Sequence, residues 1–253
     1  SALEQRIQDC VENSNHVQRW KSAFVVSNGE TIWVRIVARG ELDAQSQICA
    51  RVHLVCEDIT DARALERELQ YQASHDPLTS LYNRREFERR LQLIFTDRRY
   101  DDARYSLCCL DLDNFKVVND TCGHVAGDQM LRRLGEILTR FIRSEDILAR
   151  LGGDEFAMLM HNAPIDDAQK LVERLRVAIE EFSFVWESQV FHVTGSFGLT
   201  EIVEHHGAAS DALRDADAAC YAAKQNGRNR IQVNWQYGRR LGKPGGSRLP
   251  NIR

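Results

Sequence analysis

The alternation of apolar and polar residues divides the chain into segments of different period. Residues 22–57 hold two apolar runs on either side of Asn28-Gly29, a dipeptide typical of a tight hairpin turn, and a third apolar run follows. This pattern predicts three antiparallel strands. Three strands bury too little apolar surface to form a core of their own, so we expect residues 1–57 to be the C-terminal part of a domain that continues upstream.

A helical period begins at Asp58. Apolar residues recur every three or four positions with charged residues between them, which predicts an amphipathic helix over residues 58–74 with a narrow apolar seam. The seam consists of Ile59, Ala62, Leu65, Leu69 and Ala73. So narrow a seam suits a two-stranded coiled coil, and a helix packed on its own domain accounts for it equally well.

Residues 75–235 alternate between strand and helix patterns over a length sufficient for one domain. We expect strands at 105–110, 147–150, 156–160, 190–200 and 231–233, and helices at 83–97, 124–142, 166–184 and 210–225. The core order of strand, helix, strand, strand, helix and strand is the split βαβ arrangement. The sequence therefore predicts an α+β fold, a ferredoxin-like (palm-type) βαββαβ domain. Residues 236–253 have no apolar period and are predicted to be a flexible basic tail or linker.

The composition narrows the class of protein. The chain has 253 residues, of which 43% are hydrophobic and 28% charged, as in soluble globular domains. No run approaches the roughly 18 consecutive apolar residues of a transmembrane helix, and the N-terminus lacks the layout of a secretory signal. Since the sequence begins with Ser1, we expect membrane contact only through an anchor upstream in a longer parent chain. The seven cysteines include no C-x-x-C pair, which favours a reduced, cytoplasmic setting.

Charge is distributed unevenly along the chain. The net charge is −4, but residues 236–253 contain five basic residues and no acidic one, so the remainder of the chain carries −9. A folded body this acidic binds nucleic acid poorly, because the phosphate backbone is itself negative. We therefore expect no nucleic-acid partner.

Acidic residues gather at two places that this fold brings together. Asp111 and Asp113 come at the close of the first core strand in CLDLDNFK, and a Gly-Gly turn between the two middle strands is followed at once by Asp154 and Glu155. In a split βαβ fold the first strand lies beside the middle hairpin, so both clusters face one edge of the sheet. Glycines in the turn let a ligand approach the backbone, although a plain hairpin with solvated acids also fits this turn.

Two or three carboxylates suffice for a nucleotide-bound Mg²⁺, because this ion keeps waters and takes phosphate oxygens as its other ligands. Asp111 and Asp154 are the candidate ligands. Residues 114–118 lie between strand and helix, where their turn is expected to present backbone N–H groups to phosphates, with Lys116 as an added cation. These features predict a site for a metal-bound nucleotide.

Four motifs, in order, resemble those of one known family. They are DPLTSLYNRREF, DLDNFKVVNDTCGHVAGDQML, RLGGDEF and AAKQNGRNRI, and they span residues 75 to about 233. The sequence resembles the GGDEF diguanylate cyclases, nucleotidyl cyclases that condense two molecules of GTP into cyclic di-GMP and pyrophosphate. The resemblance implies a GGDEF domain at 75–235. Ser80, where glycine is common, and Cys122, where an aromatic residue is common, are departures away from the expected chemistry.

The resemblance implies that the metal ligands are Asp111, Asp154 and the backbone carbonyl of Leu112, and that Asp154 and Glu155 are the catalytic residues. It also implies Mg²⁺ or Mn²⁺ as the cofactor, with two ions per active site when GTP is bound. The implied reaction is attack of the 3′-hydroxyl of one GTP on the α-phosphorus of another. Metal ions assist by lowering the hydroxyl pKa and neutralising phosphate charge.

The same resemblance assigns the contacts with GTP. The substrate-binding positions are Asn114, Phe115, Lys116, Asn119, Asp128, Lys224 and Arg228. Guanine is placed on Asn119 and Asp128, and a carboxylate suits this base because its N1–H and N2–H donors lie side by side. Lys224 and Arg228 match a phosphate-contacting pair. Without the resemblance, they are basic residues that complement the C-terminal end of a helix.

A second pattern, Arg143-Ser-Glu-Asp146, is separated from Gly152 by five residues. In the family, RxxD at this offset is the inhibitory product site, with a further arginine from the next helix, for which Arg174 is the matching position. Arginine suits both guanine O6 and N7 and phosphate oxygens. The simpler alternative is an i,i+3 surface ion pair, worth roughly a few tenths of a kcal/mol.

The N-terminal segment resembles, in part, the C-terminal half of a PAS domain, through NGETIWVRIVARG and VHLVCEDITDAR. The first half of that fold is absent, so we expect a partial PAS-like antiparallel sheet and a connecting helix, and we name no sensory ligand. A cyclic product needs two GTP molecules and one site holds one, so activity is expected from a homodimer. The alternative function is a non-catalytic receptor for cyclic di-GMP or GTP.

Overall fold

The structure is a computed structural model that describes residues 2–12, 16–43, 45, 49–96, 103–203 and 206–234. The chain divides into two compact units, residues 1–72 and 73–253, and each has its own internal packing. The segment 236–253, predicted to be a basic tail, lies outside the described residues.

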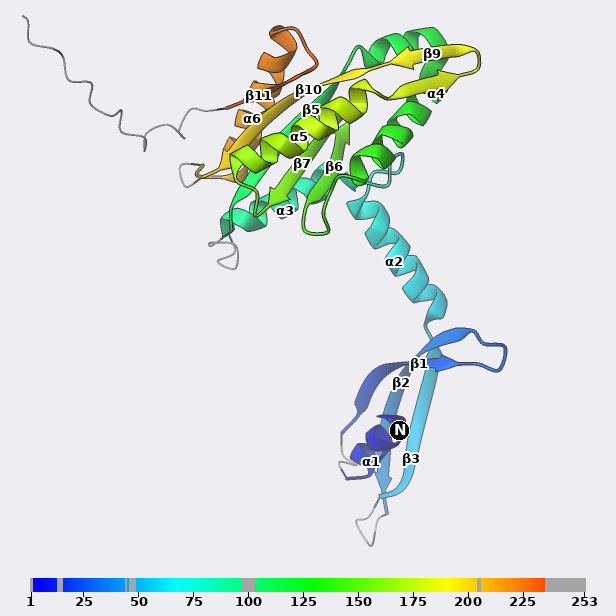
Figure 1. Ribbon diagram of the computed structural model, residues 1–253. Helices are drawn as coiled ribbons and strands as arrows, with labels where there is room; N and C mark the ends of the chain where they lie inside the picture. Colours follow the sequence, from blue (N-terminus) through cyan, green and yellow to red (C-terminus); the bar gives the residue numbers. More distant parts are fainter. Residues whose placement is uncertain are drawn as a thin grey trace, which may run out of the picture. The chain divides into compact units, whose positions relative to one another are not determined.

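The first unit is a three-stranded antiparallel sheet in the order β1–β2–β3, with one short helix. Its elements are α1 (Ala2–Glu12), β1 (Gln18–Val25), β2 (Thr31–Leu42) and β3 (Cys49–Asp58) (Figure 1). The predicted hairpin turn is present, and Gly29 adopts a φ of 86° there. The sequence pattern does not predict α1. This helix packs against β2 and β3, and the buried residues of the unit include Cys10, Ile36 and Ala38.

The connecting helix α2 (Thr60–Ser74) begins close to the predicted position. Its start is held against the sheet of the first unit, because the Arg63 guanidinium lies 3.6 Å from the centroid of the Trp33 ring on β2. No residue of α2 is buried, and Leu65 and Leu69 are 61% and 57% exposed. The predicted apolar seam is therefore open to solvent along α2, whereas its first residue, Ile59, precedes the helix and is buried.

The second unit is built on a six-stranded sheet in the order β11–β10–β5–β7–β6–β4. The strands are β4 (Tyr82–Asn83), β5 (Tyr105–Asp113), β6 (Ile147–Gly152), β7 (Glu155–His161), β10 (Thr194–Ile202) and β11 (Arg230–Val233). β5 is antiparallel to both β10 and β7, and β6 is antiparallel to β7. This is the strand arrangement of a βαββαβ core, so the predicted α+β, ferredoxin-like fold is confirmed.

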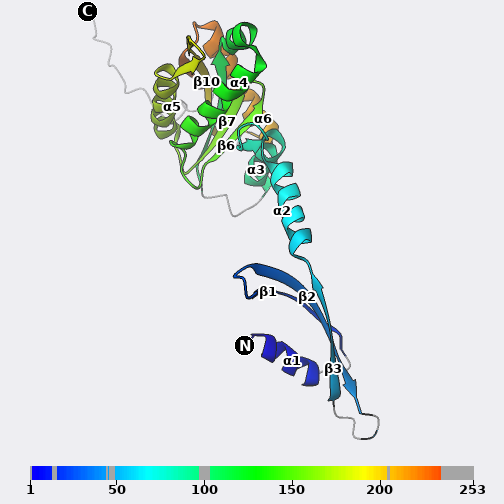
Figure 2. The ribbon, with the colours of Figure 1, turned by 90° about the vertical axis from the view of Figure 1, so that its right-hand side faces the viewer.

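Four helices cover the sheet, two on each face. They are α3 (Arg84–Thr96), α4 (Phe115–Thr139), α5 (Ile165–Glu180) and α6 (Ala209–Gln225). α4 and α5 pack on one face, and α3 and α6 pack on the other. Figure 2 shows α5 and the pair α3 and α6 on opposite sides of the sheet.

The alternation of side chains along β5 explains how both faces are filled. Leu110 and Leu112 belong to the core beneath α4 and α5, whereas Leu107 and Cys109 belong to the core beneath α3 and α6. Because successive side chains point to opposite faces, Asp111 continues the row of Leu107 and Cys109. Its carboxylate therefore lies on the face that carries α6.

Several predicted boundaries are wrong. β5 continues beyond the predicted end at Leu110, because Asp113 still pairs with Thr194 of β10. The helix predicted at 166–184 ends at Glu180, and the strand predicted at 190–200 is two strands. The extra elements are β8 (Ser183–Trp186) and β9 (Gln189–His192), which form a separate hairpin. Runs of four residues are too short for a period of 2.0 to be distinguished from one of 3.6.

The helix predicted at 124–142 is also wrong at both ends. α4 begins at Phe115 and ends at Thr139, so residues 114–118 are an N-cap and first helical turn rather than a separate turn before the helix. Gly123 interrupts α4 with φ 78° and ψ 168°, a conformation that glycine adopts at little cost. Because of this interruption, one apolar period does not run through the whole helix, and the sequence pattern does not reveal its first part.

The described helices include none that is long and apolar enough to cross a membrane. All seven cysteines are free thiols. Burial raises the pKa of the Cys108 thiol well above its ordinary value, which suppresses the reactive thiolate.

Candidate active site

Two stretches of acidic residues that are far apart in the sequence meet at the end of β5. Asp111 pairs across the sheet with Glu155, the first residue of β7, and the Leu112 N–H donates to the carbonyl oxygen of Asp154 at 3.3 Å. The two glycines of the intervening turn have φ of 145° and 53°, and a Cβ on either would meet no atom within 4 Å. The hairpin therefore brings Asp154 next to β5 and leaves open space around its glycines.

Lys224 of α6 supplies a counter-charge to these acids. Its Nζ lies 2.5 Å from Asp111 Oδ2, with 33% and 15% of the respective side chains exposed. Burial raises the pKa of Asp111 above its ordinary value, and the charges of Asp154 and Glu155 add to this effect, although the bond from Lys224 opposes it. Burial by itself would lower the pKa of Lys224, but the bond to Asp111 outweighs burial and the pKa is raised. The pKa of Asp111 thus rises mainly through burial, and that of Lys224 rises through its bond to Asp111.

The oxygen ligands at this site suit a divalent cation whose remaining ligands are water and substrate oxygens. Among the residues that the structure describes, no group of three or more histidine, cysteine, aspartate or glutamate side chains is arranged to hold a metal ion. Asp111 and Asp154 with the carbonyl of Leu112 would supply part of a coordination shell, and Mg²⁺ completes such a shell with water and phosphate oxygens. The ammonium group of Lys224 already occupies a place where these acids accept positive charge.

Two arginines brace the acidic hairpin. Arg150 donates to the carbonyl oxygen of Gly153 from Nε at 2.9 Å and from Nη2 at 2.8 Å, and its Nη1 lies 3.1 Å from Asp76 Oδ1. Arg84 donates to Glu155 at 3.3 Å. Arg150 is not among the predicted site residues, although it directly precedes the LGGDEF residues. Its bonds tie the turn to the loop that follows α2, so the position of the hairpin does not depend on its own turn alone.

The chain turns sharply from β5 into α4, at the predicted phosphate-binding segment. Asn114 is the N-cap with a φ of 59°, and its side chain makes no capping hydrogen bond. Phe115 is buried in the core and Lys116 is exposed. The first N–H groups of a helix have no partner within the helix, so this turn offers donors to an anion.

The predicted guanine contacts, Asn119 and Asp128, lie on the two parts of α4 and are brought together across the interruption. A Cβ on Gly127 would lie 2.0 Å from Asn119 Oδ1, so glycine is required there for the Asn119 side chain to rest against this turn. Asp128 is the next residue, and both predicted side chains are half-buried. The Asn119 amide thus rests against Gly127, the residue that directly precedes Asp128 in the second part of the helix.

Lys224 and Arg228, predicted as a phosphate-contacting pair, have different surroundings. Arg228 lies beyond the end of α6 with a φ of 61°, and 55% of its side chain is exposed. Its Nε is 4.0 Å from Oδ1 of Asp113, whose side chain is fully buried. Asp113 is not among the predicted site residues. Asp113 is the second aspartate of CLDLDNFK and lies two positions after Asp111, so both side chains point to the same face of the sheet. This spacing is the sequence signal that could have identified Asp113 as a site residue.

A cavity of about 210 Å³ lies beside the acidic residues. Asp111, Glu155 and Lys224 line it together with Asp217 and Tyr221 of α6. Asp217 and Tyr221 are not among the predicted site residues. They precede Lys224 by seven and three positions, a spacing that puts all three on one face of a helix.

The second predicted constellation also comes together. Arg143, Asp146 and Arg174 line one cavity of about 400 Å³. The Asp146 carboxylate accepts the backbone N–H of Arg143 at 3.2 Å and that of His161 at 2.9 Å, which differs from the simple side-chain ion pair. The Arg174 guanidinium lies 5.4 Å from the centroid of the Phe141 ring. Two arginines and a carboxylate fixed by the main chain therefore surround one hollow.

Comparisons of the chain with a family model, with known proteins and with solved structures all indicate the same family. Residues 73–230 match the family model described as "Diguanylate cyclase, GGDEF domain". The chain is 42% identical over 180 residues to the probable diguanylate cyclase DgcE of Escherichia coli, which covers 71% of this chain and 16% of that protein. It is 34% identical over 202 residues to the diguanylate cyclase DgcP of Pseudomonas aeruginosa, which covers 77% of this chain and 30% of that protein. The chain thus spans less than a third of either relative.

A solved structure is also similar. It contains the coiled coil and GGDEF domain of DgcB from Caulobacter crescentus in complex with c-di-GMP, with a TM-score of 0.65 and 29% identity over 70% of this chain and 93% of that one. The family match covers more than half of the chain and includes both acidic clusters, α4 and the end of α6. The chain therefore belongs to the GGDEF diguanylate cyclase family.

Proposed function

We propose that this chain is a diguanylate cyclase that condenses two molecules of GTP into cyclic di-GMP and pyrophosphate. The observation that carries the proposal is the meeting of Asp111, Asp154 and Glu155 with Lys224 at one end of the sheet, in a member of this family. Three carboxylates gathered beside a paired lysine suit a positively charged metal with a polyphosphate.

In this proposal the residues at the end of β5 hold and orient the substrate. Asp111, Asp154 and the carbonyl of Leu112 would hold Mg²⁺ or Mn²⁺, two ions per site with GTP bound. When bound, the metal lowers the pKa of the attacking 3′-hydroxyl and neutralises charge on the phosphates. The hydroxyl loses its proton to solvent as its oxygen bonds to the α-phosphorus of the other GTP, and the bond to the departing pyrophosphate breaks. A second, reciprocal step closes the ring and releases a second pyrophosphate. Glu155 lies beside Asp111 and adds to the negative field.

The proposed GTP contacts fall into two groups, one that binds the base and one that binds the phosphates. Asn119 and Asp128 accept the N–H donors of guanine. The N–H groups at the start of α4, from Asn114 to Lys116, bind phosphate oxygens together with Lys224 and Arg228. Lys224 exchanges its bond to Asp111 for a bond to the triphosphate, since the same carboxylate cannot serve a metal and an ammonium group equally.

Two copies of the chain are needed, because each site holds one GTP and the product contains two nucleotides. We propose that the exposed seam of α2, with Leu65 and Leu69, pairs two chains, and that the first unit is a partial PAS-like element that transmits a signal through this helix. Sedimentation of a Leu65→Lys, Leu69→Lys variant with GTP present would test this pairing. A wild-type monomer that is active would contradict it.

We further propose that the cavity lined by Arg143, Asp146 and Arg174 binds cyclic di-GMP and inhibits the enzyme. Arginine pairs with both phosphate and the O6 and N7 edge of guanine, so the side chains suit this product. The support is the assembly of all three residues around one hollow, with Asp146 fixed by two backbone N–H groups.

The decisive experiment is incubation of the protein with GTP and Mg²⁺, followed by chromatography and mass measurement of the nucleotides. Cyclic di-GMP and pyrophosphate are the expected products, and chelation of the metal should stop their formation. Binding of cyclic di-GMP or GTP without any turnover would instead support the non-catalytic receptor.

A further inference from the structure

Three successive residues in the turn that follows α6 have positive φ angles. Gly227, Arg228 and Asn229 have φ of 111°, 61° and 44°. For a non-glycine residue this positive-φ region is costly, and it persists where the surroundings enforce it. Arg228, a proposed phosphate contact, is therefore carried by a strained turn that other residues must hold in place.

Asp113 holds the turn from the side of the sheet. Its side chain is fully buried and accepts three hydrogen bonds: from the Thr194 hydroxyl at 2.8 Å, the Ser196 hydroxyl at 2.7 Å and the Asn229 backbone N–H at 3.0 Å. The two hydroxyls come from β10 and fix the carboxylate, which then fixes the backbone of Asn229. A buried carboxylate with three donors is a rigid anchor for the residue next to Arg228.

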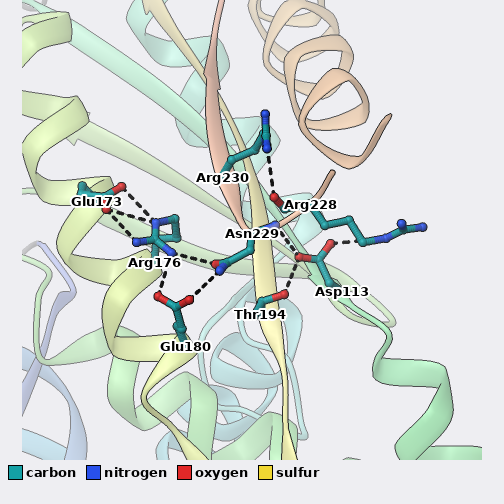
Figure 3. Close-up of polar contacts among 8 residues, drawn as sticks. All are labelled: Asp113, Glu173, Arg176, Glu180, Thr194, Arg228, Asn229 and Arg230. Atoms are coloured by element: carbon teal, nitrogen blue, oxygen red, sulfur yellow. Dashed lines mark hydrogen bonds and ion pairs between the residues drawn. The ribbon is translucent and has the colours of Figure 1, made fainter. Parts of the chain in front are cut away.

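Helix α5 holds the same turn from the other side. The Asn229 side chain accepts a hydrogen bond from Arg176 at 2.8 Å and donates one to Glu180 at 2.7 Å. Arg176 is itself fixed by Glu173 and Glu180 at 2.8 and 2.9 Å. Figure 3 shows Asn229 between Asp113 and Arg176, so the turn is bound on both flanks.

We infer that Asp113 is a positioning residue that acts through Arg228 on the triphosphate of GTP; this inference rests on the proposed function. Asp113 is buried and negative, so it does not bind phosphate itself. Its Oδ1 faces Nε of Arg228 at 4.0 Å, and Figure 3 shows the tip of the Arg228 side chain extending past the carboxylate. More than half of the Arg228 side chain is exposed, so its terminal nitrogens are open to an anion, which a guanidinium group can bind bidentately.

The test is a double-mutant cycle on nucleotide affinity. The probe is 3′-deoxy-GTP with Mg²⁺, which lacks the attacking hydroxyl and cannot react. Asp113→Ala should weaken its binding about tenfold, because a displaced arginine loses its alignment with the phosphates. Arg228→Ala should weaken binding at least as much, and adding Asp113→Ala to it should cost less than about twofold more. The missing additivity is the signature of an effect that passes through Arg228.

Conservative and control variants separate positioning from general damage to the fold. In Asp113→Asn, the amide oxygen can still accept from Thr194 and Asn229 while the Ser196 hydroxyl reverses to accept, so affinity should return to within about threefold of wild type. Ser106→Ala at the opposite end of β5 removes another buried hydrogen bond, 2.7 Å to the Ala163 carbonyl, and should leave affinity unchanged. If Asp113→Ala does not fold, Thr194→Val removes one donor and should show a smaller loss with the same dependence on Arg228.

Each result decides the matter. Normal affinity in Asp113→Ala, or an equal loss with and without Arg228, would overturn the positioning role while leaving the proposed function intact. Failure of the wild-type protein to bind 3′-deoxy-GTP would overturn the proposed function and this inference with it.

Discussion

The two predicted nucleotide sites hold their charged side chains in opposite ways. At the end of β5, Asp111 is mostly buried and lies 2.5 Å from Lys224, so its charge is balanced from within. At the second site, Arg143 and Arg174 are exposed, and the bonds of Asp146 go to backbone N–H groups. At the first site only the charge of Asp111 is balanced by Lys224, whereas the second presents exposed arginines to solvent.

A ligand must therefore do different work at the two sites. At the end of β5 it must replace an existing buried bond between Lys224 and Asp111, and charges there interact more strongly than in water. At the second site a phosphate-bearing ligand meets exposed arginines, whose attraction is screened by salt beyond about 10 Å at 0.1 M. We expect substitutions to have larger effects at the first site, and binding at the second to weaken more steeply as salt is added.

The largest effect is expected from Asp154→Asn. The change keeps the shape of the side chain but removes a charge from the acidic hairpin beside Asp111, so cyclic di-GMP formation should fall by about 10³-fold or more. Product formation is measured by chromatography, and circular dichroism checks that the fold is retained. Glu136→Gln on the exposed side of α4 is the matched control and should keep its activity. Full activity of Asp154→Asn would remove this residue from the mechanism.

The next largest effect concerns the second site. Arg143→Ala removes one of its two arginines, so the concentration of cyclic di-GMP needed for half-inhibition should rise about tenfold. Inhibition curves at two salt concentrations provide the measurement, and Arg133→Ala, an exposed arginine of α4, is the control. An unchanged inhibition curve would return Arg143 to the role of a surface charge.

A smaller effect is expected from Asp76→Asn, which weakens the support of the acidic hairpin without touching the acids. Burial acts to raise the pKa of Asp76, but hydrogen bonds from Thr79 and the Arg150 ion pair act against it, and the pKa is lowered overall. The variant should lose about 1–2 kcal/mol of unfolding free energy at pH 7 and a few-fold in activity.

The pH dependence of that loss follows from the direction of the pKa shift. A carboxyl whose pKa is lowered by folding contributes its full stability above its unfolded pKa, about 3.9, and loses it as the pH falls through the folded value. The difference between wild type and Asp76→Asn in denaturant unfolding should therefore be constant above about pH 5 and shrink below pH 4. A difference that persists at low pH would mean that shape, not charge, matters at Asp76.

The parts of the candidate sites also differ in how far their side-chain contacts can be predicted from the sequence. The meeting of Asp111 with Glu155 follows from fold topology, because the strand order puts β5 beside β7 and the period of two fixes the face. The hollow around Arg143 and Arg174 is different, because Arg143 and Asp146 lie in the loop between α4 and β6 and only the resemblance to the family implies their site. The first meeting depends on regular strands, whose period of two can be read from the residues themselves.

The contacts of Asp113 could not be predicted in this way. Its partners Thr194, Ser196 and Asn229 lie 81, 83 and 116 positions away, and the last sits in a turn rather than in a helix or strand. No period relates such positions, and the left-handed φ of Asn229 follows from the packing around it. The interruption at Gly123 was missed for a similar reason, because glycine permits a break without requiring one.

The smallest effect is expected from Lys170→Ala, at the margin of the second site. Lys170 lines the same cavity as Arg143, but its Nζ pairs with Asp167 at 2.8 Å and both side chains are exposed. An exposed pair of this kind contributes little to folding, so denaturant unfolding should be unchanged. Half-inhibition by cyclic di-GMP should shift by less than about twofold, because the lysine acts as a hydrated point charge without the planar fork of arginine. A shift as large as that of Arg143→Ala would show that net charge, and not arginine geometry, governs this site.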